Sequence, residues 1–362
     1  MRAEALTENY RRIVGAVGPG VRMLPMVKAE AYGLGACAVV ARLEPLDPWG
    51  YGVATVAEGV ALRDADIARP IVVCSPVPPG EVVAAVRHDL QLSVSSVSAL
   101  RRVAEAGRAE GRTAAVHLDV DTGMGRSGFD WRSATDWLPE VSAAMEGIRW
   151  VGCQTHLHSA DVDEASAVEQ WTRLEGVFEQ LDPLPDGLMV HVLNSAGAFR
   201  TPAYARALVR PGIFLYGGKI GDDLPTPEPV VSVRARVAHV RDVPAGTTVG
   251  YGATHTSVGS ARWATLAIGY GDGLPRALGN RGCAIVGGVR APMIGRISMD
   301  VTVVDITGVP DVAEGSIATL VGGAGGEDIG LDEIAEQAGT ISYEILTGLT
   351  CRLPRVWLDG DH

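Results

Sequence analysis

The sequence predicts an α/β protein with two parts: an N-terminal (β/α)8 barrel of the TIM type in residues 1–225 and a mainly β C-terminal domain in residues 226–362. In the first part, eight short apolar runs alternate with helix-like segments, which is the order expected of a barrel of parallel strands. An open, doubly wound sheet is the alternative for this alternation. The predicted strands are 23–28, 51–55, 70–74, 91–95, 114–120, 149–155, 190–194 and 207–210.

Helical spacing supports the segments between these strands. The clearest is 164–181, in which apolar residues such as Val168, Trp171 and Leu174 recur three or four positions apart. Segments 57–66 and 97–110 are also predicted to be helices. A short helical continuation is expected after the eighth strand.

The pattern changes near residue 225. Residues 222–229 contain three prolines and are predicted to be a linker or a turn into a strand. Residues 231–240 then alternate apolar and polar residues with the period of a β-strand. A helix is expected at 331–347, after a Gly-rich connection over 322–330. Further strands are predicted at 262–268, 282–286, 298–306 and 317–321.

Composition excludes several classes of protein. The formal net charge of −12 over 362 residues argues against non-specific nucleic-acid binding, which needs a basic surface. The five cysteines form no CxxC pair, so neither a disulfide framework nor a structural zinc site is indicated, and a reducing cytoplasm fits best. No run reaches the roughly 18–20 apolar residues of a membrane span, and the N-terminus lacks an apolar signal segment. We therefore expect a cytoplasmic protein without membrane partners.

Lys28 stands at the end of the first predicted strand, directly before a Gly-rich segment. A lysine there would be partly desolvated, which lowers its pKa and makes a neutral, nucleophilic amine accessible. Such lysines form covalent bonds with carbonyl cofactors such as pyridoxal 5'-phosphate (PLP). The simpler alternative is a strand-end lysine that extends its ammonium into water.

Polar residues follow other predicted strands of the barrel at the same end. Functional groups of (β/α)8 barrels gather at the C-terminal ends of the strands, and phosphate often binds after strands 7 and 8. Ser195 offers a hydroxyl there, and Gly212 and Ile213 offer backbone amides, so together they form a candidate phosphate site. Arg126, His156, Asn194 and Arg210 belong to the same group of strand-end residues.

Two further motifs carry less weight. The segment 123–128 fits GxGxxG and follows a strand, but Asp121 and Arg126 crowd it and no helix start follows, so a dinucleotide site is not favoured. His156 and His158 could face the same way on an extended chain. No neighbouring pair of ligands completes a metal site, so no metal is predicted.

In their order along the chain, these segments resemble the alanine racemase family, which depends on PLP. The resemblance covers nearly the whole sequence and includes the lysine segment 26–35, Asp121-Thr-Gly-Met-Gly-Arg126, Arg210-Pro-Gly-Ile213, Gly250-Tyr-Gly-Ala-Thr254 and Ile294-Gly-Arg-Ile-Ser-Met-Asp300. It implies a barrel followed by a β domain in a head-to-tail homodimer. The PLP-binding residues that it implies are Lys28, which would hold the cofactor covalently, Tyr32, His156, Asn194, Ser195, Arg210, Gly212, Ile213 and Tyr343.

The same resemblance implies the interconversion of L- and D-alanine by two acid/base groups. Lys28 would serve one face of the substrate, and Tyr251 of the partner subunit would serve the other. Arg126 and the backbone of Met299 would receive the substrate carboxylate. On the sequence alone, a racemase of another small amino acid such as serine, or a non-catalytic PLP-binding protein, remains an alternative.

One position departs from the family pattern. Many members carry a carbamate-modified lysine seven residues before the carboxylate-binding arginine, and this chain has Asp119 there. An aspartate supplies the same negative charge on a shorter side chain. We expect Asp119 to pair with Arg126 and to hold it in position for the substrate, whereas the alternative is an acid that only caps a strand.

Overall fold

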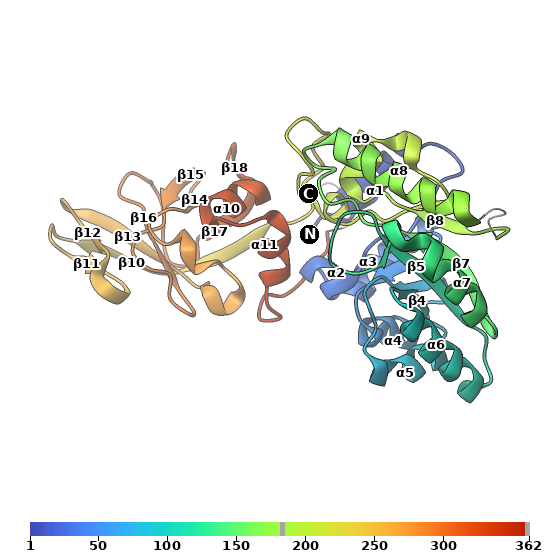
Figure 1. The fold of residues 1–362 in the computed structure, drawn as a ribbon. Helices are drawn as coiled ribbons and strands as arrows, with labels where there is room; N and C mark the ends of the chain where they lie inside the picture. Colours follow the sequence, from blue (N-terminus) through green and yellow to red (C-terminus); the bar gives the residue numbers. More distant parts are fainter. Residues whose placement is uncertain (182–184, 359–362) are drawn as a thin grey trace.

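The computed structural model describes residues 1–181 and 185–358. The chain folds into two lobes that meet near both termini (Figure 1). The strands of the first, which we call the barrel lobe, overlap the predicted ranges, except for a short strand at 129–130 that was not predicted. They are β1 (Arg22–Met23), β2 (Tyr51–Val53), β3 (Ile71–Val73), β4 (Gln91–Val94), β5 (Ala114–Asp121), β6 (Phe129–Asp130), β7 (Ile148–Gln154), β8 (Met189–His191) and β9 (Leu208–Val209).

The barrel lobe contains a closed parallel barrel. Its strands follow the order β1-β9-β8-β7-β5-β4-β3-β2, with β6 paired to β5. A parallel bridge between Met26 and Gly52 joins the chain after β1 to β2 and closes the circle. The predicted (β/α)8 fold class is therefore confirmed, and the open sheet is excluded.

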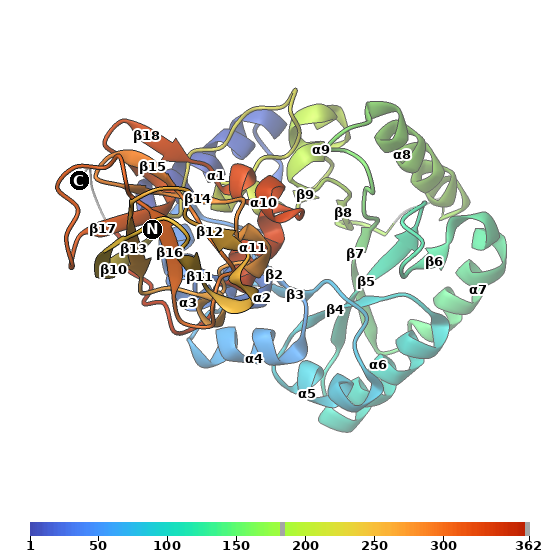
Figure 2. The same ribbon diagram turned by 90° about the vertical axis from the view of Figure 1, so that its left-hand side faces the viewer.

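Helices surround this barrel on the outside, as Figure 2 shows for α4 to α8. Capping side chains fix where some of them begin. Thr55 Oγ1 accepts a hydrogen bond from the Glu58 amide at 3.2 Å, and the Glu58 carboxylate accepts one from the Thr55 amide at 3.1 Å, which starts α4 with a capping box. The helices are α1 (Ala3–Val17), α2 (Lys28–Gly33), α3 (Ala36–Leu43), α4 (Val56–Asp64), α5 (Val82–Arg87), α6 (Val97–Glu110), α7 (Ala134–Ala144), α8 (Glu164–Phe178) and α9 (Ser195–Arg200).

The second lobe, which we call the β lobe, is a mainly antiparallel sheet. Along its first strand, Val233, Ala235 and Val237 are buried while Arg234 and Arg236 are exposed, so the predicted alternation places one face in the core. The elements are β10 (Val233–Val243), β11 (Thr248–Val249), β12 (His255–Thr256), β13 (Ala261–Leu266), β14 (Cys283–Val286), β15 (Val289–Pro292), β16 (Thr302–Asp305), β17 (Ile317–Ala324), β18 (Glu327–Ile329), α10 (Leu331–Ala338) and α11 (Ser342–Gly348).

Three local predictions are wrong. Lys28 does not close a strand, because β1 ends at Met23 and Lys28 begins α2. The single helix expected at 331–347 is divided into α10 and α11, since Gly339 ends α10 in a left-handed conformation with φ 73°. The Gly-rich connection at 322–330 is mostly a hairpin, in which β17 pairs with β18.

The mouth of the barrel is in contact with the β lobe and with the last described segment of the chain. α11 lies beside α2 in both views (Figures 1 and 2). A Cβ atom on Gly33 would lie 2.3 Å from the carbonyl oxygen of Leu346, so this contact requires glycine. The segment after α11 returns to the N-terminus, where the Leu358 amide donates to the Met1 carbonyl oxygen at 2.8 Å.

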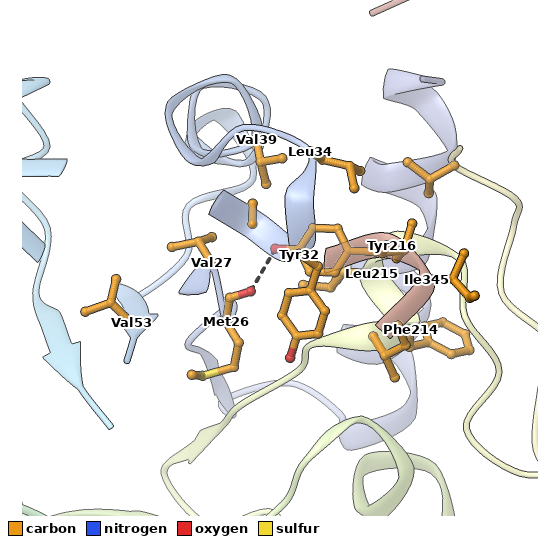
Figure 3. Close-up of a cluster of buried hydrophobic side chains, with 14 of the residues drawn as sticks. Met26, Val27, Tyr32, Leu34, Val39, Val53, Phe214, Leu215, Tyr216 and Ile345 are labelled. Carbon is orange, nitrogen blue, oxygen red and sulfur yellow. Dashed lines mark hydrogen bonds between the residues drawn. The ribbon is translucent and has the colours of Figure 1, made fainter. Parts of the chain in front are cut away.

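A buried aromatic cluster supports α2 from below (Figure 3). The ring of Tyr216, which ends the short 3-10 helix η6 (Ile213–Tyr216), stacks on Tyr32 with centroids 4.7 Å apart. The Tyr216 hydroxyl donates a hydrogen bond to the Met26 carbonyl oxygen at 2.7 Å. This cluster therefore fixes the chain on both sides of Lys28.

Candidate active site

A cavity of about 460 Å³ lies at the C-terminal ends of the barrel strands, where (β/α)8 barrels place their functional groups. Its size suits a small ligand or a cofactor. Eleven of the predicted site residues line it. They are Lys28, Tyr32, Asp119, Arg126, His156, Asn194, Ser195, Arg210, Gly212, Ile213 and Tyr343.

Lys28 is followed by a turn in the left-handed backbone conformation, which residues other than glycine rarely adopt. The next four residues have positive φ, with values of 51° at Ala29, 54° at Glu30, 50° at Ala31 and 56° at Tyr32. A left-handed conformation costs each non-glycine residue about 1–2 kcal/mol. Strain of this kind persists only where the surroundings hold it, and it is frequent at functional sites. Here the turn places Lys28 and Tyr32 in the same cavity.

The Lys28 amine lies in an environment that disfavours its charged form. Burial is the main cause that lowers its pKa, and the guanidinium groups of Arg126 and Arg210 lower it further. Cys74 and Glu58 act in the opposite direction. A lysine with a lowered pKa is a better nucleophile and proton acceptor near neutral pH, which agrees with the interpretation of Lys28 as a reactive amine.

Arg210 is 5% exposed and is held by protein acceptors on several sides. Its Nη2 donates to the Thr155 carbonyl oxygen at 2.6 Å, and its Nη1 donates to both the carbonyl oxygen and Nδ1 of His191. Among the described residues, no carboxylate lies within ion-pair distance of Arg210. The guanidinium therefore adds a buried positive charge at the bottom of the cavity without a directly paired carboxylate in the part of the chain that the structure describes.

A chain of buried side chains extends from Arg210 across the barrel. Because Arg210 can only donate, His191 Nδ1 must accept, and the proton of His191 then lies on Nε2. His191 Nε2 donates to His117 Nδ1 at 2.8 Å, and His117 Nε2 donates to Gln91 Oε1 at 2.7 Å. Burial and the charge of Arg210 lower the pKa of His117 to about 3 and that of His191 well below its usual value. Both rings are neutral, and their tautomers are fixed.

His156 lies in the cavity beside this arginine. Its Nδ1 is 3.4 Å from Arg210 Nη2. Burial, followed by the charges of Arg210, Arg126 and Lys28, lowers the pKa of His156 to about 3. A neutral imidazole offers a flat, weakly polar surface against which an aromatic ring can lie.

The candidate phosphate site is assembled at the end of the cavity formed by α9 and η6. The Gly212 amide donates to Ser195 Oγ at 2.8 Å. A Cβ on Gly212 would lie 2.3 Å from the Tyr32 hydroxyl oxygen, so the close approach of this hydroxyl to the backbone requires glycine. The Asn194 side chain caps α9 by accepting from the Gly197 amide at 2.9 Å. The Tyr343 ring lies 6.0 Å from the Tyr32 ring, centroid to centroid.

Asp119 does not pair directly with Arg126. Within the described part of the chain, no ion pair within 4 Å joins the two residues, and the Asp119 carboxylate instead accepts hydrogen bonds from Ser95 Oγ at 3.2 Å and Ser127 Oγ at 3.0 Å. Burial raises the pKa of Asp119, and these hydroxyl groups oppose that shift. The direct pairing predicted from the sequence is therefore not present in this structure, and the carboxylate instead contacts Ser127, the residue next to Arg126 in the chain.

Tyr251 and Met299 lie on the β lobe and do not line the cavity. Tyr251 is 71% exposed and begins the 3-10 turn η7 (Tyr251–Ala253), and Met299 is 52% exposed. A single chain thus brings together eleven of the thirteen predicted residues. The other two face outward.

Some polar residues in and behind the cavity wall were not predicted from the sequence. Cys74 lines the cavity, and burial raises the pKa of its thiol to about 11. His117 lies two positions before Asp119 on β5, so the alternation of that strand could have placed both side chains inside the barrel. The partners of His117, on β4 and β8, become visible only in the folded structure.

Three findings concern metals, dinucleotides and membranes. Over residues 1–181 and 185–358, no group of three or more His, Cys, Asp or Glu side chains is arranged to hold a metal ion. The segment 123–128 is followed by β6 and a 3-10 turn at Trp131–Ser133, which is not the strand-to-helix geometry of a dinucleotide fingerprint. In the same described ranges, no helix has both the length and the apolar character needed to span a membrane.

Comparison with known proteins relates both lobes to one family. Residues 1–220 match the family described as "Alanine racemase, N-terminal domain" and residues 230–357 match "Alanine racemase, C-terminal domain". A relative named alanine racemase from Syntrophobacter fumaroxidans is 36% identical over 345 residues, which cover 94% of this chain and 92% of that protein.

Solved structures of the same family have a similar fold. The alanine racemase from D-cycloserine-producing Streptomyces lavendulae has a TM-score of 0.93 at 31% identity, and the match covers 99% of this chain and 96% of that one. The alanine racemase from Bartonella henselae, described with covalently bound pyridoxal phosphate, has a TM-score of 0.90 at 29% identity, covering 99% and 98%. This chain belongs to the alanine racemase family.

Proposed function

We propose that this protein interconverts L- and D-alanine with PLP as its cofactor. The observation that carries the proposal is Lys28, a primary amine with a lowered pKa that shares one cavity with Arg126 and Arg210. Such an amine can bond the aldehyde carbon of PLP. When bound, PLP supplies an electron sink for the electron pair left at the substrate Cα after proton removal.

The described residues fit this cofactor. A phosphate group requires N–H and O–H donors, and the hydroxyls of Tyr32 and Ser195 with the amides of Gly212 and Ile213 lie at one end of the cavity. Asn194 and Tyr343 adjoin them. Because Gly212 has no side chain, the Tyr32 hydroxyl can lie close to its backbone, which keeps these two donors together at this end of the cavity.

Arg210 and His156 would contact the ring of the cofactor. A guanidinium can donate a hydrogen bond to a pyridine nitrogen, but with a pKa above about 12 it does not give up its proton readily. Arg210 would therefore leave that nitrogen unprotonated, which limits negative charge build-up on the ring and suppresses side reactions such as transamination. The neutral ring of His156 would pack against the cofactor.

Racemisation requires two acid/base groups on opposite faces of the substrate Cα. We assign Lys28 to one face and Tyr251 of the partner subunit to the other, because Tyr251 of the same chain is exposed on the β lobe and outside the cavity. One group removes the proton, and the other returns a proton from the opposite side. The function thus requires a homodimer in head-to-tail arrangement, in which each β lobe completes the cavity of the other chain.

Arg126 would bind the substrate carboxylate, together with the backbone amide of Met299 of the partner subunit. Arg126 is exposed at the cavity, and its neighbour Ser127 donates to the buried Asp119 carboxylate at 3.0 Å. We infer that Asp119 restrains the backbone that carries Arg126. The Asp119 carboxylate accepts from Ser95 and Ser127 rather than from Arg126, which leaves the guanidinium available for the substrate carboxylate.

The lysine content allows a direct test of the covalent step. The chain contains two lysines, Lys28 in the cavity and Lys219, which is exposed. After incubation with PLP and reduction with borohydride, peptide mass mapping should place the adduct on Lys28. Lys28→Arg should remove the adduct, while Lys219→Arg, the matched control, should retain it. A stoichiometric adduct on Lys219, or none on Lys28, would contradict the cofactor assignment.

A second measurement tests the reaction itself. In deuterated water with L-alanine, deuterium should enter the Cα position and both enantiomers should accumulate. Uptake of deuterium without inversion would contradict racemisation. L-serine, compared under the same conditions, measures how far the pocket distinguishes small side chains, since a small added group changes binding in an apolar pocket by only about 1–3 kcal/mol.

A further inference from the structure

The left-handed turn that follows Lys28 is held at both ends by side chains from outside it. At its start, the Ala29 amide donates to Glu58 Oε1 at 2.7 Å. At its end, the Gly33 carbonyl oxygen accepts from Arg355 Nε at 3.0 Å and Nη2 at 2.8 Å. The two anchors come from α4 of the barrel lobe and from the returning C-terminal segment. Neither of them lines the cavity.

Glu58 uses both oxygen atoms of its carboxylate. Oε1 accepts from Ala29, while Oε2 accepts from the amides of Ala54 at 2.7 Å and Thr55 at 3.1 Å. All three partners are N–H donors. An amide side chain in this place would have to direct its NH2 group at one of them. The site therefore requires a carboxylate that joins the start of α4 to the start of the turn.

Arg355 connects the turn to a segment far away in the sequence. Besides Gly33, its guanidinium donates to the carbonyl oxygens of Leu349 at 2.9 Å, Leu353 at 2.7 Å and Thr350. In the described chain no carboxylate lies within ion-pair distance of Arg355. The planar fork of arginine can reach these acceptors together, whereas a single ammonium group cannot.

Backbone strain persists only when neighbouring groups fix it. The turn has four consecutive non-glycine residues at positive φ, so it would relax if its ends were released. Lys28 directly precedes the turn, and its side chain must reach into the cavity. We propose that Glu58 and Arg355 are positioning residues that hold the left-handed turn, and through it the Lys28 amine, inside the cavity.

Two other roles for Glu58 make different predictions. As a nearby negative charge, Glu58 raises the pKa of Lys28, so its loss alone would lower that pKa. As a helix cap, it would affect the stability of α4 and leave Lys28 unchanged. If Glu58 positions the turn, its loss releases Lys28 toward water, which raises the pKa because burial is the main cause that lowers it. The groups that act on Lys28 by charge are Cys74, Arg126, Glu58 and Arg210.

The experiment measures the pKa of Lys28 in the full-length protein freed of cofactor. Competitive acetylation over a pH range, followed by peptide mapping, gives the midpoint for Lys28, with the exposed Lys219 as an internal reference. Glu58→Gln should raise the Lys28 midpoint by about one pH unit, the size of a typical shift in proteins. Glu58→Asp, which keeps the charge but shortens the side chain, should shift it in the same direction.

Thr55→Ala is the matched control for helix capping. It removes the hydroxyl that accepts from the Glu58 amide at 3.2 Å and leaves the bond between Ala29 and Glu58 in place. Its Lys28 midpoint should equal that of the wild type. A lower midpoint in Glu58→Gln would show that Glu58 acts by charge, and equal midpoints in Glu58→Gln and Thr55→Ala would show that it only caps α4. Either result overturns the proposal.

Arg355→Gln tests the other anchor, including the case in which Glu58→Gln does not fold. Loss of the two hydrogen bonds from Arg355 to the Gly33 carbonyl oxygen should also raise the Lys28 midpoint. Arg352→Gln is its control, because Arg352 lies on the same segment and forms ion pairs with Asp272 and Asp300 rather than with the turn. Equal midpoints in the two variants would refute the role of Arg355. Because acetylation needs neither PLP nor alanine, these outcomes do not depend on the proposed racemase function.

Discussion

The cavity of the barrel lobe and the exposed turn of the β lobe contain the two halves of one predicted site in opposite environments. Arg210 is 5% exposed in the cavity, whereas Tyr251 and Met299 are 71% and 52% exposed on the β lobe. Burial in the cavity changes the acid/base behaviour of Lys28, since it is the main cause that lowers the pKa of this amine. Under the proposed mechanism, one chain therefore prepares one face of the reaction, and a second molecule supplies the other face.

The largest expected effect is on Tyr251. Tyr251→Phe removes the hydroxyl that would exchange a proton with the substrate and should reduce kcat by about 10²–10⁴-fold. Since the side chain is exposed, the variant should unfold at the same urea concentration as the wild type. Steady-state kinetics and urea titration measure the two quantities.

Mixed dimers decide whether the hydroxyl acts on the partner. An equimolar mixture of Lys28→Ala and Tyr251→Phe chains, dissociated and reassembled, should recover activity, because each mixed dimer contains a single intact site. If Tyr251 served the cavity of its own chain, every site would stay incomplete and no activity would return.

Acid should destabilise the barrel lobe through its buried histidines. The pKa values of His117 and His156 are about 3, and that of His191 is well below the usual 6.5. Below pH 6.5 the unfolded chain binds protons that the folded chain does not. The free energy of unfolding should therefore fall as pH drops from 6.5 toward 3, by up to about 1.4 kcal/mol per pH unit for each histidine. Asp119, whose pKa is raised, acts in the opposite direction above pH 3.8.

Urea titrations between about pH 7 and pH 5 measure this slope. His191→Gln should reduce it, because glutamine can still accept from Arg210 and donate to His117 but does not titrate. A slope in His191→Gln equal to that of the wild type would refute the assignment of acid sensitivity to the barrel lobe.

Gly152 gives a smaller effect at the same buried histidine chain. A Cβ on Gly152 would lie 2.0 Å from His117 Nδ1, so Gly152→Ala should displace the ring and destabilise the protein by about 1–3 kcal/mol. Gly176, inside α8, has nothing within 4 Å of such a Cβ. Gly176→Ala should stabilise the protein by about 0.5–1 kcal/mol. Thermal unfolding compares the pair, and a shift of the same sign in both variants would argue against the clash.

The smallest effect is expected at Asp119. Asp119→Asn can keep one hydrogen bond from Ser127 but loses the charge that strengthens it, which is worth about 1 kcal/mol. The KM for alanine should rise several-fold, with kcat nearly unchanged, because Arg126 is the residue proposed to bind the substrate carboxylate. An unchanged kcat/KM would show that Asp119 does not position Arg126.

Much of the barrel could be predicted from the sequence because each buried strand is a short apolar run between helices of regular spacing. The predicted range 114–120, for example, differs from β5 by one residue at its end. Residues at the ends of these strands then had to meet at one mouth, which placed His156, Ser195 and Arg210 together.

Other features depend on tertiary contacts that leave no local signal. Ala29, Glu30 and Ala31 are good helix formers, so nothing in this segment indicates a left-handed turn. The direct partners of Asp119 are Ser95 on one side and Ser127 on the other, and only the folded structure distinguishes them from Arg126. The hydrogen bonds of Arg355 connect positions at opposite ends of the chain, which a reading of neighbouring residues cannot reveal.

The left-handed conformation of the Ala29–Tyr32 turn also determines which substitutions this part of the chain can accept. Glu30 is exposed with φ 54°, a value at which branching at Cβ increases the clash with the backbone. In a saturation library at this position, glycine and asparagine should therefore be enriched over valine and isoleucine. A mirror-image D-residue introduced there by semisynthesis would occupy this conformation without steric cost.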